Sequence, residues 1–325
     1  MGSAPRKLLL LSVALIAMFV PSAATAAGSS GDPTAHRLVA GLRGGSGSTV
    51  GPDGALYVTE SAAGRITRVD PRTGATTTYA SGLPALLPAV GFGGPVDIAF
   101  LGRTAYVLVT LVGPDVGGSD VVGIYRVDGP DRFTVIADIG AFSINHPPAT
   151  DFFVPSGVQY ALQTYRGGFL VTDGHHNRVL RVTRDGQITV LRTFGNIVPT
   201  GLDARGRTIY MAQAGPVPHL PQDGKVVAFG PTSTSVGEVA SGRPLLVDVE
   251  FGHGHRLYAL SQGVGSGGPE GSPALPNTGA LVKANRDGTF TVLTDALNQP
   301  TSLEFIGKTA YVVTLGGEIW KINGV

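Results

Sequence analysis

A short strand pattern marked by one aromatic residue recurs six times along this chain and limits its fold more than any other feature. In the first copy, residues 51–69, a tight Gly-Pro-Asp-Gly turn leads into an apolar strand, a small-residue turn and a second strand. A unit of roughly 40–50 residues that contains only strands is typical of a propeller blade. The six marker residues are 41 to 63 residues apart and predict an all-β, six-bladed β-propeller: Tyr57, Tyr106, Phe169, Tyr210, Tyr258 and Tyr311.

Each repeat is expected to contain four strands, named a to d from the axis outward. Strand a begins near a Pro-x-(Gly/Ser/Asp)-aliphatic column, of which residues 95–98 and 199–202 are copies. Proline suits the first residue of a strand, where a missing N–H does least harm. Strand b carries the aromatic marker, strand c alternates polar and apolar residues, and strand d follows a turn that contains Gly or Asp.

The last repeat lacks a strand d of its own, because only residues 323–325 follow its strand c. At the other end of the chain, residues 36–42 match the d strands of the other repeats. An N-terminal strand that completes the last blade leaves no unpaired edge at the seam. We therefore expect residues 36–325 to form a single propeller domain that is closed in this way.

The first 26 residues have the pattern of a signal peptide. Arg6 and Lys7 supply positive charge, residues 8–20 are an apolar run, and residues 24–26 (Ala-Thr-Ala) form a cleavage signal. The apolar run is short for a bilayer span. We expect cleavage after Ala26, a secreted, extracellular protein without stable membrane insertion, and a flexible Gly/Ser-rich lead-in at residues 27–35.

Composition and charge narrow the classes of partner. The 48 Gly and 23 Pro residues fit a chain with many tight turns, and with no Cys the chain cannot depend on disulfides. The formal net charge is +1, and removal of the leader changes it to −1. This near-neutral balance argues against nucleic-acid binding, which needs a dense cationic face. We also expect a monomer.

The extra length of the chain is expected at one end of the ring. The a–b turns and most c–d turns are tight, whereas the b–c loops and d–a connections are long. These two loop classes emerge on the same face of a propeller, and long loops on a rigid scaffold are where binding normally occurs. The long segment at residues 263–278 could equally be a flexible insertion that has no role in binding. The other long segments are residues 81–94, 112–120, 140–154 and 214–222.

Two acidic residues stand where the strand-a column elsewhere has a small residue. Asp97 and Asp248 are therefore expected near the central channel, as a polar lining or a weak cation site. The alternative is that each carboxylate accepts backbone N–H bonds near a strand start, which is the more common use of such a residue.

The b–c turn of the third repeat contains His175, His176 and Asn177. Adjacent histidines are expected to face different ways, so they would need outside ligands such as His146 or Asp151 to hold a metal ion. Because Asn is also a turn former, a structural role for this turn is the alternative.

The Pro-stiffened loop at residues 146–153 is better suited to contacting a ligand than to acid–base chemistry. No paired carboxylates at hydrolase spacing, nucleophile elbow, phosphate loop or Cys/His nucleophile occurs in the sequence. We expect no catalytic residue and no metal ligand. The expected ligand-binding residues are Asp97, His146, Asp151, Phe152, His175, Asn177, His219 and Asp248.

Several blade motifs resemble the ScyD/ScyE family of exported propellers. They are residues 51–58 (Gly-Pro-Asp-Gly-Ala-Leu-Tyr-Val), 94–100 together with 105–107, and 198–202. The resemblance covers essentially the whole mature chain and implies a six-bladed, NHL-like ring without an established catalytic activity. Residues 44–48 (Gly-Gly-Ser-Gly-Ser) depart from the usual sequence pattern of the family in the first blade.

Wider relatives include the SMP-30/gluconolactonase-like lactonases, in which a carboxylate at the second position of the strand-a column helps to hold a divalent metal. A hard cation needs several oxygen ligands with charge among them. This argues against a lactonase of that type, because none of the equivalent positions is acidic: Ser46, Val96, Ser156, Thr200, Val247 and Thr301.

The function expected from the sequence is an exported binding module without catalysis or a cofactor. Its ligand, a small molecule, glycan or protein, is expected on the face with the long b–c and d–a loops. The alternative is a divalent-metal-assisted lactonase or hydrolase with its site at the central channel.

Overall fold

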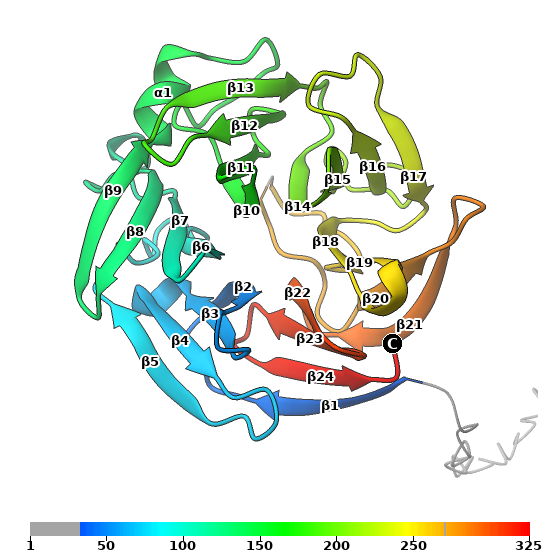
Figure 1. Cartoon of the computed structure of the whole chain (residues 1–325). Coiled ribbons are helices and arrows are strands. Elements are labelled where there is room, and N and C mark those ends of the chain that lie inside the picture. The colour runs from blue at the N-terminus through cyan, green and yellow to red at the C-terminus, as the bar shows by residue number, and fades with distance from the viewer. Residues whose placement is uncertain (1–32, 270) are drawn as a thin grey trace, which may run out of the picture. The chain divides into compact units, whose positions relative to one another are not determined.

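The computed structural model describes residues 33–269 and 271–325 (Figure 1). The predicted leader and residues 27–32 of the predicted lead-in lie outside the described residues. Six antiparallel four-stranded sheets are arranged around a central axis. The prediction of an all-β, six-bladed propeller is therefore confirmed.

The six blades follow the predicted a-to-d strand order. Blade 1 contains β2 (Gly45–Val50), β3 (Leu56–Glu60), β4 (Arg65–Val69) and β5 (Thr76–Ser81). Blade 2 contains β6 (Gly94–Leu101), β7 (Thr104–Thr110), β8 (Gly123–Gly129) and β9 (Arg132–Asp138). Blade 3 contains β10 (Gln159–Tyr165), β11 (Gly168–Asp173), β12 (Arg178–Val182) and β13 (Ile188–Thr193). Blade 4 contains β14 (Pro199–Arg205), β15 (Thr208–Gln213), β16 (Lys225–Phe229) and β17 (Gly237–Ser241). Blade 5 contains β18 (Leu246–Phe251), β19 (Leu257–Ser261), β20 (Gly279–Ala284) and β21 (Phe290–Leu297). Blade 6 contains β22 (Pro300–Ile306), β23 (Thr309–Thr314), β24 (Ile319–Asn323) and β1 (Thr34–Val39).

The two ends of the described chain share blade 6, as predicted. Strand β1 pairs antiparallel with β24, from Thr34 opposite Asn323 to Val39 opposite Ile319. An ion pair between Arg37 and Glu318, at 2.7 Å, lies beside the seam. The N-terminal strand thus closes the ring and removes an open sheet edge.

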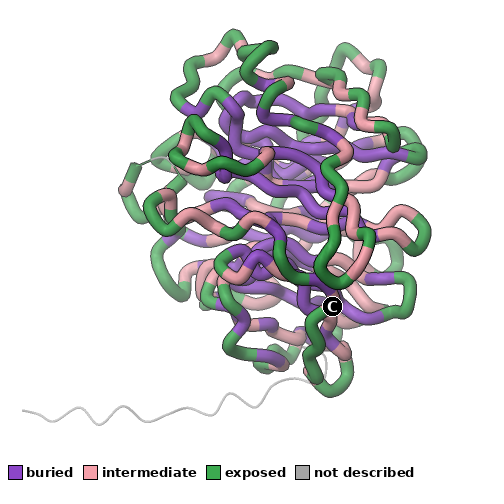
Figure 2. The backbone as a smooth tube through the Cα atoms, turned by 90° about the vertical axis from the view of Figure 1, so that its left-hand side faces the viewer, coloured by how far each residue is buried: buried purple, intermediate pink, exposed green. Residues whose placement is uncertain are grey.

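The recurring aromatic residue packs between neighbouring blades in several places, which gives its repetition a physical reason. Strand b is the buried centre of a blade, and β3 and β11 are buried along their whole length. Buried residues fill the middle of the molecule, whereas exposed residues lie mostly at the turns (Figure 2). In three blades the strand-b tyrosine contacts a phenylalanine of the next inner strand, with ring centroids 4.6 to 4.9 Å apart: Tyr57 with Phe100, Tyr210 with Phe251, and Tyr258 with Phe305.

Every inner strand pairs irregularly with its strand b. The register between the two strands shifts once in each of the six blades. Such a bulge bends the strand and changes where its side chains point. The irregularity therefore determines which inner-strand residues reach the axis.

The long connections lie where the sequence predicts them. The connection from β9 to β10 contains the short helix α1 (Ile139–Asn145), and single helical turns occur at η1 (Ser61–Ala63), η2 (Pro114–Val116) and η3 (His253–His255). We call the end of the ring formed by the b–c loops and d–a connections the long-loop rim, and the opposite end, formed by the a–b and c–d turns, the tight-turn face. Among the described residues, no helix is both long and apolar enough to cross a membrane.

Candidate functional site

The two histidines of the b–c turn of blade 3 contact the backbone of the loop that follows α1. His175 Nε2 accepts the backbone N–H groups of Phe153 and Val154, at 2.8 and 3.1 Å. His176 Nε2 lies 3.0 Å from the carbonyl oxygen of Val154. The expectation that the adjacent histidines face different ways is therefore wrong, because both imidazoles reach the same stretch of backbone.

Arg178 lies beneath this loop and is almost completely buried, with 2% of its surface exposed. Its guanidinium donates to Asp173 at 3.1 Å, to the carbonyl oxygen of His146 at 2.7 Å and to Ser143 Oγ at 2.8 Å. A buried ion pair is tolerated when such hydrogen bonds satisfy it. Arg178 therefore ties α1 and the loop after it to blade 3.

Asp173 is the acidic member of this buried network. Burial alone would raise the pKa of its carboxyl, but hydrogen bonds and positive charge from His176 and Arg178 outweigh burial and lower the pKa. The carboxylate consequently stays ionised and holds its two partners in place.

Asn177 has the structural role given as the alternative for this turn. Its backbone is left-handed, with φ of 51°, and its side-chain oxygen accepts the N–H groups of Ile197 and Val198, both at 2.9 Å. Asn177 and His175 are buried, with 3% and 6% exposure. Both predicted site residues therefore lie under the rim and shape its loops.

The other predicted rim residues lie at or near the surface. His146 and Asp151 are exposed, and the His146 ring stacks on Phe142 with centroids 4.2 Å apart. Phe152 is 39% exposed and packs edge-on against His176. His219 is partly buried in the b–c loop of blade 4, where Nδ1 lies 2.7 Å from the carbonyl oxygen of Gly215. The rim thus carries His146, Asp151 and Phe152 together, and His219 at a different blade.

Large apolar side chains are exposed mainly on the long-loop rim. Ten such side chains are exposed among the described residues, and seven of them lie on this rim. Three come from α1 and the loop after it, and four come from the b–c loops of blades 4 and 5: Ile144, Phe152, Phe153, Val217, Leu220, Val264 and Leu275.

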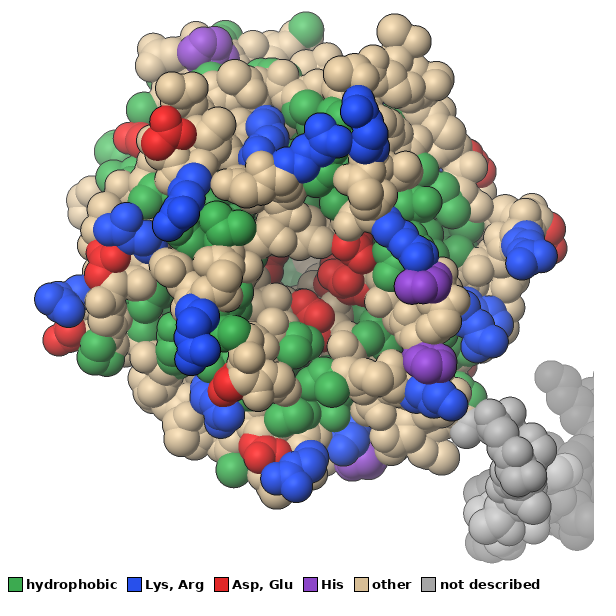
Figure 3. Space-filling model, in the orientation of Figure 1, with side chains coloured by type: hydrophobic (Ala, Val, Ile, Leu, Met, Phe, Trp, Pro, Cys, Tyr) green, Lys and Arg blue, Asp and Glu red, His purple; other side chains and the backbone are tan. Residues whose placement is uncertain are grey.

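Five carboxylates form a second candidate region near the axis, which we call the axial acidic cluster. They come from the inner strands of four blades and are partly buried: Asp97, Asp203, Asp248, Glu250 and Glu304. Figure 3 shows acidic side chains inside the central hollow of the ring.

Asp97 and Asp248 link neighbouring inner strands. Asp97 accepts the N–H of Leu162 in the next blade, at 2.6 Å. Asp248 accepts the N–H of Leu303 in the blade after it, at 2.8 Å. The backbone N–H role considered for these two residues is therefore what the structure shows, and it places both at contacts between blades.

Asp203 makes the corresponding links around blade 4. One oxygen accepts the side-chain N–H of Gln163 at 2.8 Å, and the other accepts the N–H of Phe251 at 3.1 Å. Among the described residues, no Lys, Arg or His side chain forms an ion pair with any member of the axial acidic cluster.

Burial, together with the charge of neighbouring acids, raises the pKa values of Asp97, Asp248, Glu250 and Glu304. Burial is the largest cause for Asp97, and the charge of Asp248 adds to it, so that the Asp97 pKa is well above its usual range. Burial also raises the pKa of Asp248 to about 7. The pKa values of Glu250 and Glu304 are raised well above their usual range by burial and by the neighbouring acids. Part of the cluster is therefore protonated at neutral pH.

These acids do not form a ready-made metal site. The described ranges contain no group of three or more His, Cys, Asp or Glu residues placed to hold a metal ion. The second positions of the strand-a column, where the lactonase resemblance would require a carboxylate, carry none. The residues present therefore do not fit the metal centre that the alternative function needs.

Asp203, Glu250 and Glu304 were missed by the sequence analysis. Each lies directly opposite the strand-b aromatic marker of its own blade, namely Tyr210, Tyr258 and Tyr311. An acid at this one position in three consecutive blades was the available signal. This position directly follows the four-residue strand-a column in each of these blades.

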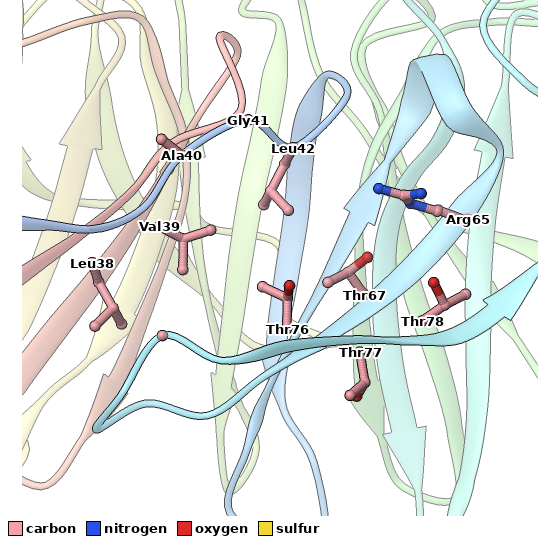
Figure 4. A pocket seen from close by; sticks show the side chains of 11 residues that line it. Leu38, Val39, Ala40, Gly41, Leu42, Arg65, Thr67, Thr76, Thr77 and Thr78 are labelled. Atoms are coloured by element: carbon pink, nitrogen blue, oxygen red, sulfur yellow. The ribbon is translucent and has the colours of Figure 1, made fainter.

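The seam between blades 6 and 1 contains a pocket of about 390 Å³ (Figure 4). Threonine hydroxyls from β4 and β5 face it, and β1 with residues 40–42 forms the other wall. Arg65 also lines the pocket. It donates two hydrogen bonds of 2.8 Å to the carboxylate of Glu60, which compensates its charge. None of the predicted site residues lies in this pocket.

Comparison with known proteins supports the fold. No protein-family model matches the sequence, and no curated protein matches it. A gluconolactonase from Xanthomonas campestris is 12% identical, with 90% of each chain covered and a TM-score of 0.62. Virginiamycin B lyase from Staphylococcus aureus is 14% identical, with 90% of this chain and 99% of that chain covered and a TM-score of 0.55. A chain in a nidogen/laminin complex is 15% identical, with coverage of 80% and 84% and a TM-score of 0.54. At these identities the likeness shows the propeller fold alone.

Proposed function

We propose that this chain is an exported binding module whose partner contacts the long-loop rim, and that it acts without catalysis. The observation that carries the proposal is the concentration of exposed apolar side chains on this rim. Soluble proteins rarely expose large apolar groups together unless the surface binds something.

One part of the rim, the loop after α1, is also held in a fixed shape, which favours binding. The loop that carries Phe152 and Phe153 is anchored from below by His175, His176 and Arg178. A binding surface that is already ordered loses less conformational entropy when its partner arrives.

We take the partner to be a protein. Five of the seven exposed rim side chains are aliphatic, and aliphatic groups cannot hydrogen-bond to the hydroxyls of a sugar. They suit the apolar centre of a protein interface, around which His146, Asp151 and His219 would supply polar contacts. The resemblance to the ScyD/ScyE family of exported propellers, and the fold likeness to a chain in a nidogen/laminin complex, support this proposal.

The test compares two matched double variants of the mature chain. Phe152→Ser/Phe153→Ser removes two rim side chains, whereas Val135→Ser/Val190→Ser removes two exposed apolar side chains from the outer strands β9 and β13. Proteins retained from the culture medium of the source organism by the immobilised wild-type chain are identified and purified. Their affinity for each soluble variant is then measured.

We expect the affinity of the rim variant to be lower by a factor of roughly ten or more, because buried aromatic side chains often supply much of the binding energy of an interface. We expect the control variant to bind as the wild type does. Equal affinity of the wild type and the rim variant, or an equal loss in both variants, would contradict the proposal.

The second candidate is a divalent-metal-assisted lactonase or hydrolase at the axial acidic cluster. The concentration of carboxyl groups near the axis favours it, but the ligand geometry does not fit. Metal analysis of the purified protein and a panel of lactones test this candidate. If the wild type contains a divalent ion and hydrolyses a lactone, and Asp97→Asn/Asp248→Asn does neither, the protein is an enzyme and the binding-module proposal is wrong.

A further inference from the structure

The a–b turns place a ring of cationic side chains around the channel mouth on the tight-turn face. Because strand a runs in the same direction in every blade, all six a–b turns meet at this end, close to the axis. Five of these turns carry at least one exposed cation, and we call this set the basic ring: Arg103, Arg166, Arg205, Arg207, Arg256 and Lys308. Figure 3 shows Lys and Arg side chains around the central hollow and acidic side chains within it.

The basic ring is available to a ligand. No member forms an ion pair with a carboxylate within the part of the chain that the structure describes. The a–b turn of blade 1 differs, since it carries Asp53, which is paired with Arg68 at 2.7 Å. The exposed, unpaired charge at the other five turns creates a positive field around the mouth.

The chemistry of the basic ring fits oxyanion groups. Five of its six members are arginines, whose planar guanidinium binds carboxylate or sulfate through two parallel hydrogen bonds. Arg166 lies over the ring of Tyr165, and Arg205 lies over the ring of Phe251, both at 5.4 Å. A guanidinium held over an aromatic ring by cation–π attraction can still donate hydrogen bonds to an oxyanion.

The axial acidic cluster determines how an anion can bind. Asp203, Glu250 and Glu304 lie within the last three residues of their inner strands, at the end nearest the a–b turns. The carboxyl groups in the channel offer an anion no positive partner, and those that remain ionised repel it from the axis. A ligand must therefore carry several separate anionic groups, each bound to a cation of the basic ring. The part of the ligand between these groups, which lies over the channel mouth, must be polar and uncharged.

We propose that the basic ring binds an acidic polysaccharide that lies across the channel mouth on the tight-turn face. A uronate chain has this arrangement, because its carboxylates are separated by sugar rings rich in hydroxyl groups. Single-stranded nucleic acid fits less well. Its bases need free aromatic faces for stacking, and the rings of Tyr165 and Phe251 are covered by arginines. This surface lies on the opposite face from the long-loop rim, so the proposal is independent of the proposed function.

The experiment measures binding of polygalacturonate to the mature chain at about 50 mM and about 200 mM NaCl, since binding through ion pairs weakens with salt. Neutral dextran, a thymidine oligonucleotide and phosphatidylglycerol vesicles are the comparison probes. Arg207→Gln/Arg256→Gln removes two charges from the basic ring. The matched control, Arg184→Gln/Arg286→Gln, removes two exposed charges from c–d turns at the same end, farther from the axis.

We expect polygalacturonate to bind the wild type and the control with affinities within about twofold of each other. We expect the basic-ring variant to bind roughly tenfold more weakly at the lower salt concentration. Thermal denaturation of each variant establishes that it is folded. Absence of polygalacturonate binding, equal binding of dextran, an equal loss in both variants, or tighter binding of the oligonucleotide or the vesicles would overturn the proposal.

Discussion

Replacing Asp248 with asparagine is expected to make the stability of the protein less dependent on pH. Burial raises the pKa of Asp248 from its ordinary 3.8 to about 7. Between these values the folded protein holds a proton that the unfolded chain has released, so the free energy of unfolding falls as the pH rises through this window. Asparagine removes the titration, but its single side-chain oxygen can accept only one of the two N–H groups, of Val249 and Leu303, that the two carboxylate oxygens accept. The cost of the lost hydrogen bond is the same at every pH, so it does not hide the change in pH dependence.

The size of the effect follows from the pKa difference. A shift of this size corresponds to about 4 kcal/mol, at ~1.36 kcal/mol for each pKa unit. Asp248 stays partly accessible to channel water and shares its titration with neighbouring acids, so we expect about half of that value, ~2 kcal/mol. For a domain of this length, a difference of this size changes the melting temperature by roughly 3 °C.

The assay is thermal and urea denaturation, followed by circular dichroism, between about pH 4 and about pH 8.5. The stability of the wild type should fall relative to that of Asp248→Asn as the pH rises, by ~2 kcal/mol over the whole range. Asp131→Asn, an exposed change in the turn between β8 and β9, is the matched control. Parallel curves for the wild type and Asp248→Asn would refute the account of the axial acidic cluster.

Three further changes test the packing. Arg178→Met leaves Asp173 charged and buried without its guanidinium partner, and we expect urea denaturation to show a loss of about 3–5 kcal/mol. In Gly201→Ala the added methyl group would collide with a carboxylate of the axial acidic cluster. The substitution should lower the free energy of unfolding by about 1–3 kcal/mol. Gly237→Ala should change the free energy of unfolding little, because the atom nearest to its added methyl group lies 3.8 Å away. Deletion of residues 34–39 leaves β24 with an unpaired edge, so size-exclusion chromatography should show association or aggregation, and a stable monomer would contradict this.

The fold could be predicted because its signals are local and repeated. Each blade contains the same aromatic slot, and this slot has a physical cause, since the ring packs against the neighbouring blade, as Tyr57 does against Phe100. The seam was also predictable, because residues 36–42 match strand d and the last repeat lacks one.

The candidate site was less predictable, because it depends on contacts between distant parts of the chain. Glu304 lies near Asp97 only because the ring closes, although more than 200 residues separate them in the sequence. The roles of His175 and Asn177 depend on loops at residues 153–154 and 197–198, which a pattern of residue types cannot place. The basic ring has the same origin, since each turn contributes one or two cations and only the topology collects them.

The pairing of β1 with β24 has a consequence for biosynthesis. Arg37 and Glu318 are 281 residues apart in the sequence, yet they lie side by side at the seam. While the polypeptide is being translated, β1 therefore has no sheet to join until β24 has been made. The ring can close only after that point, so its assembly includes the slow formation of a very long-range contact.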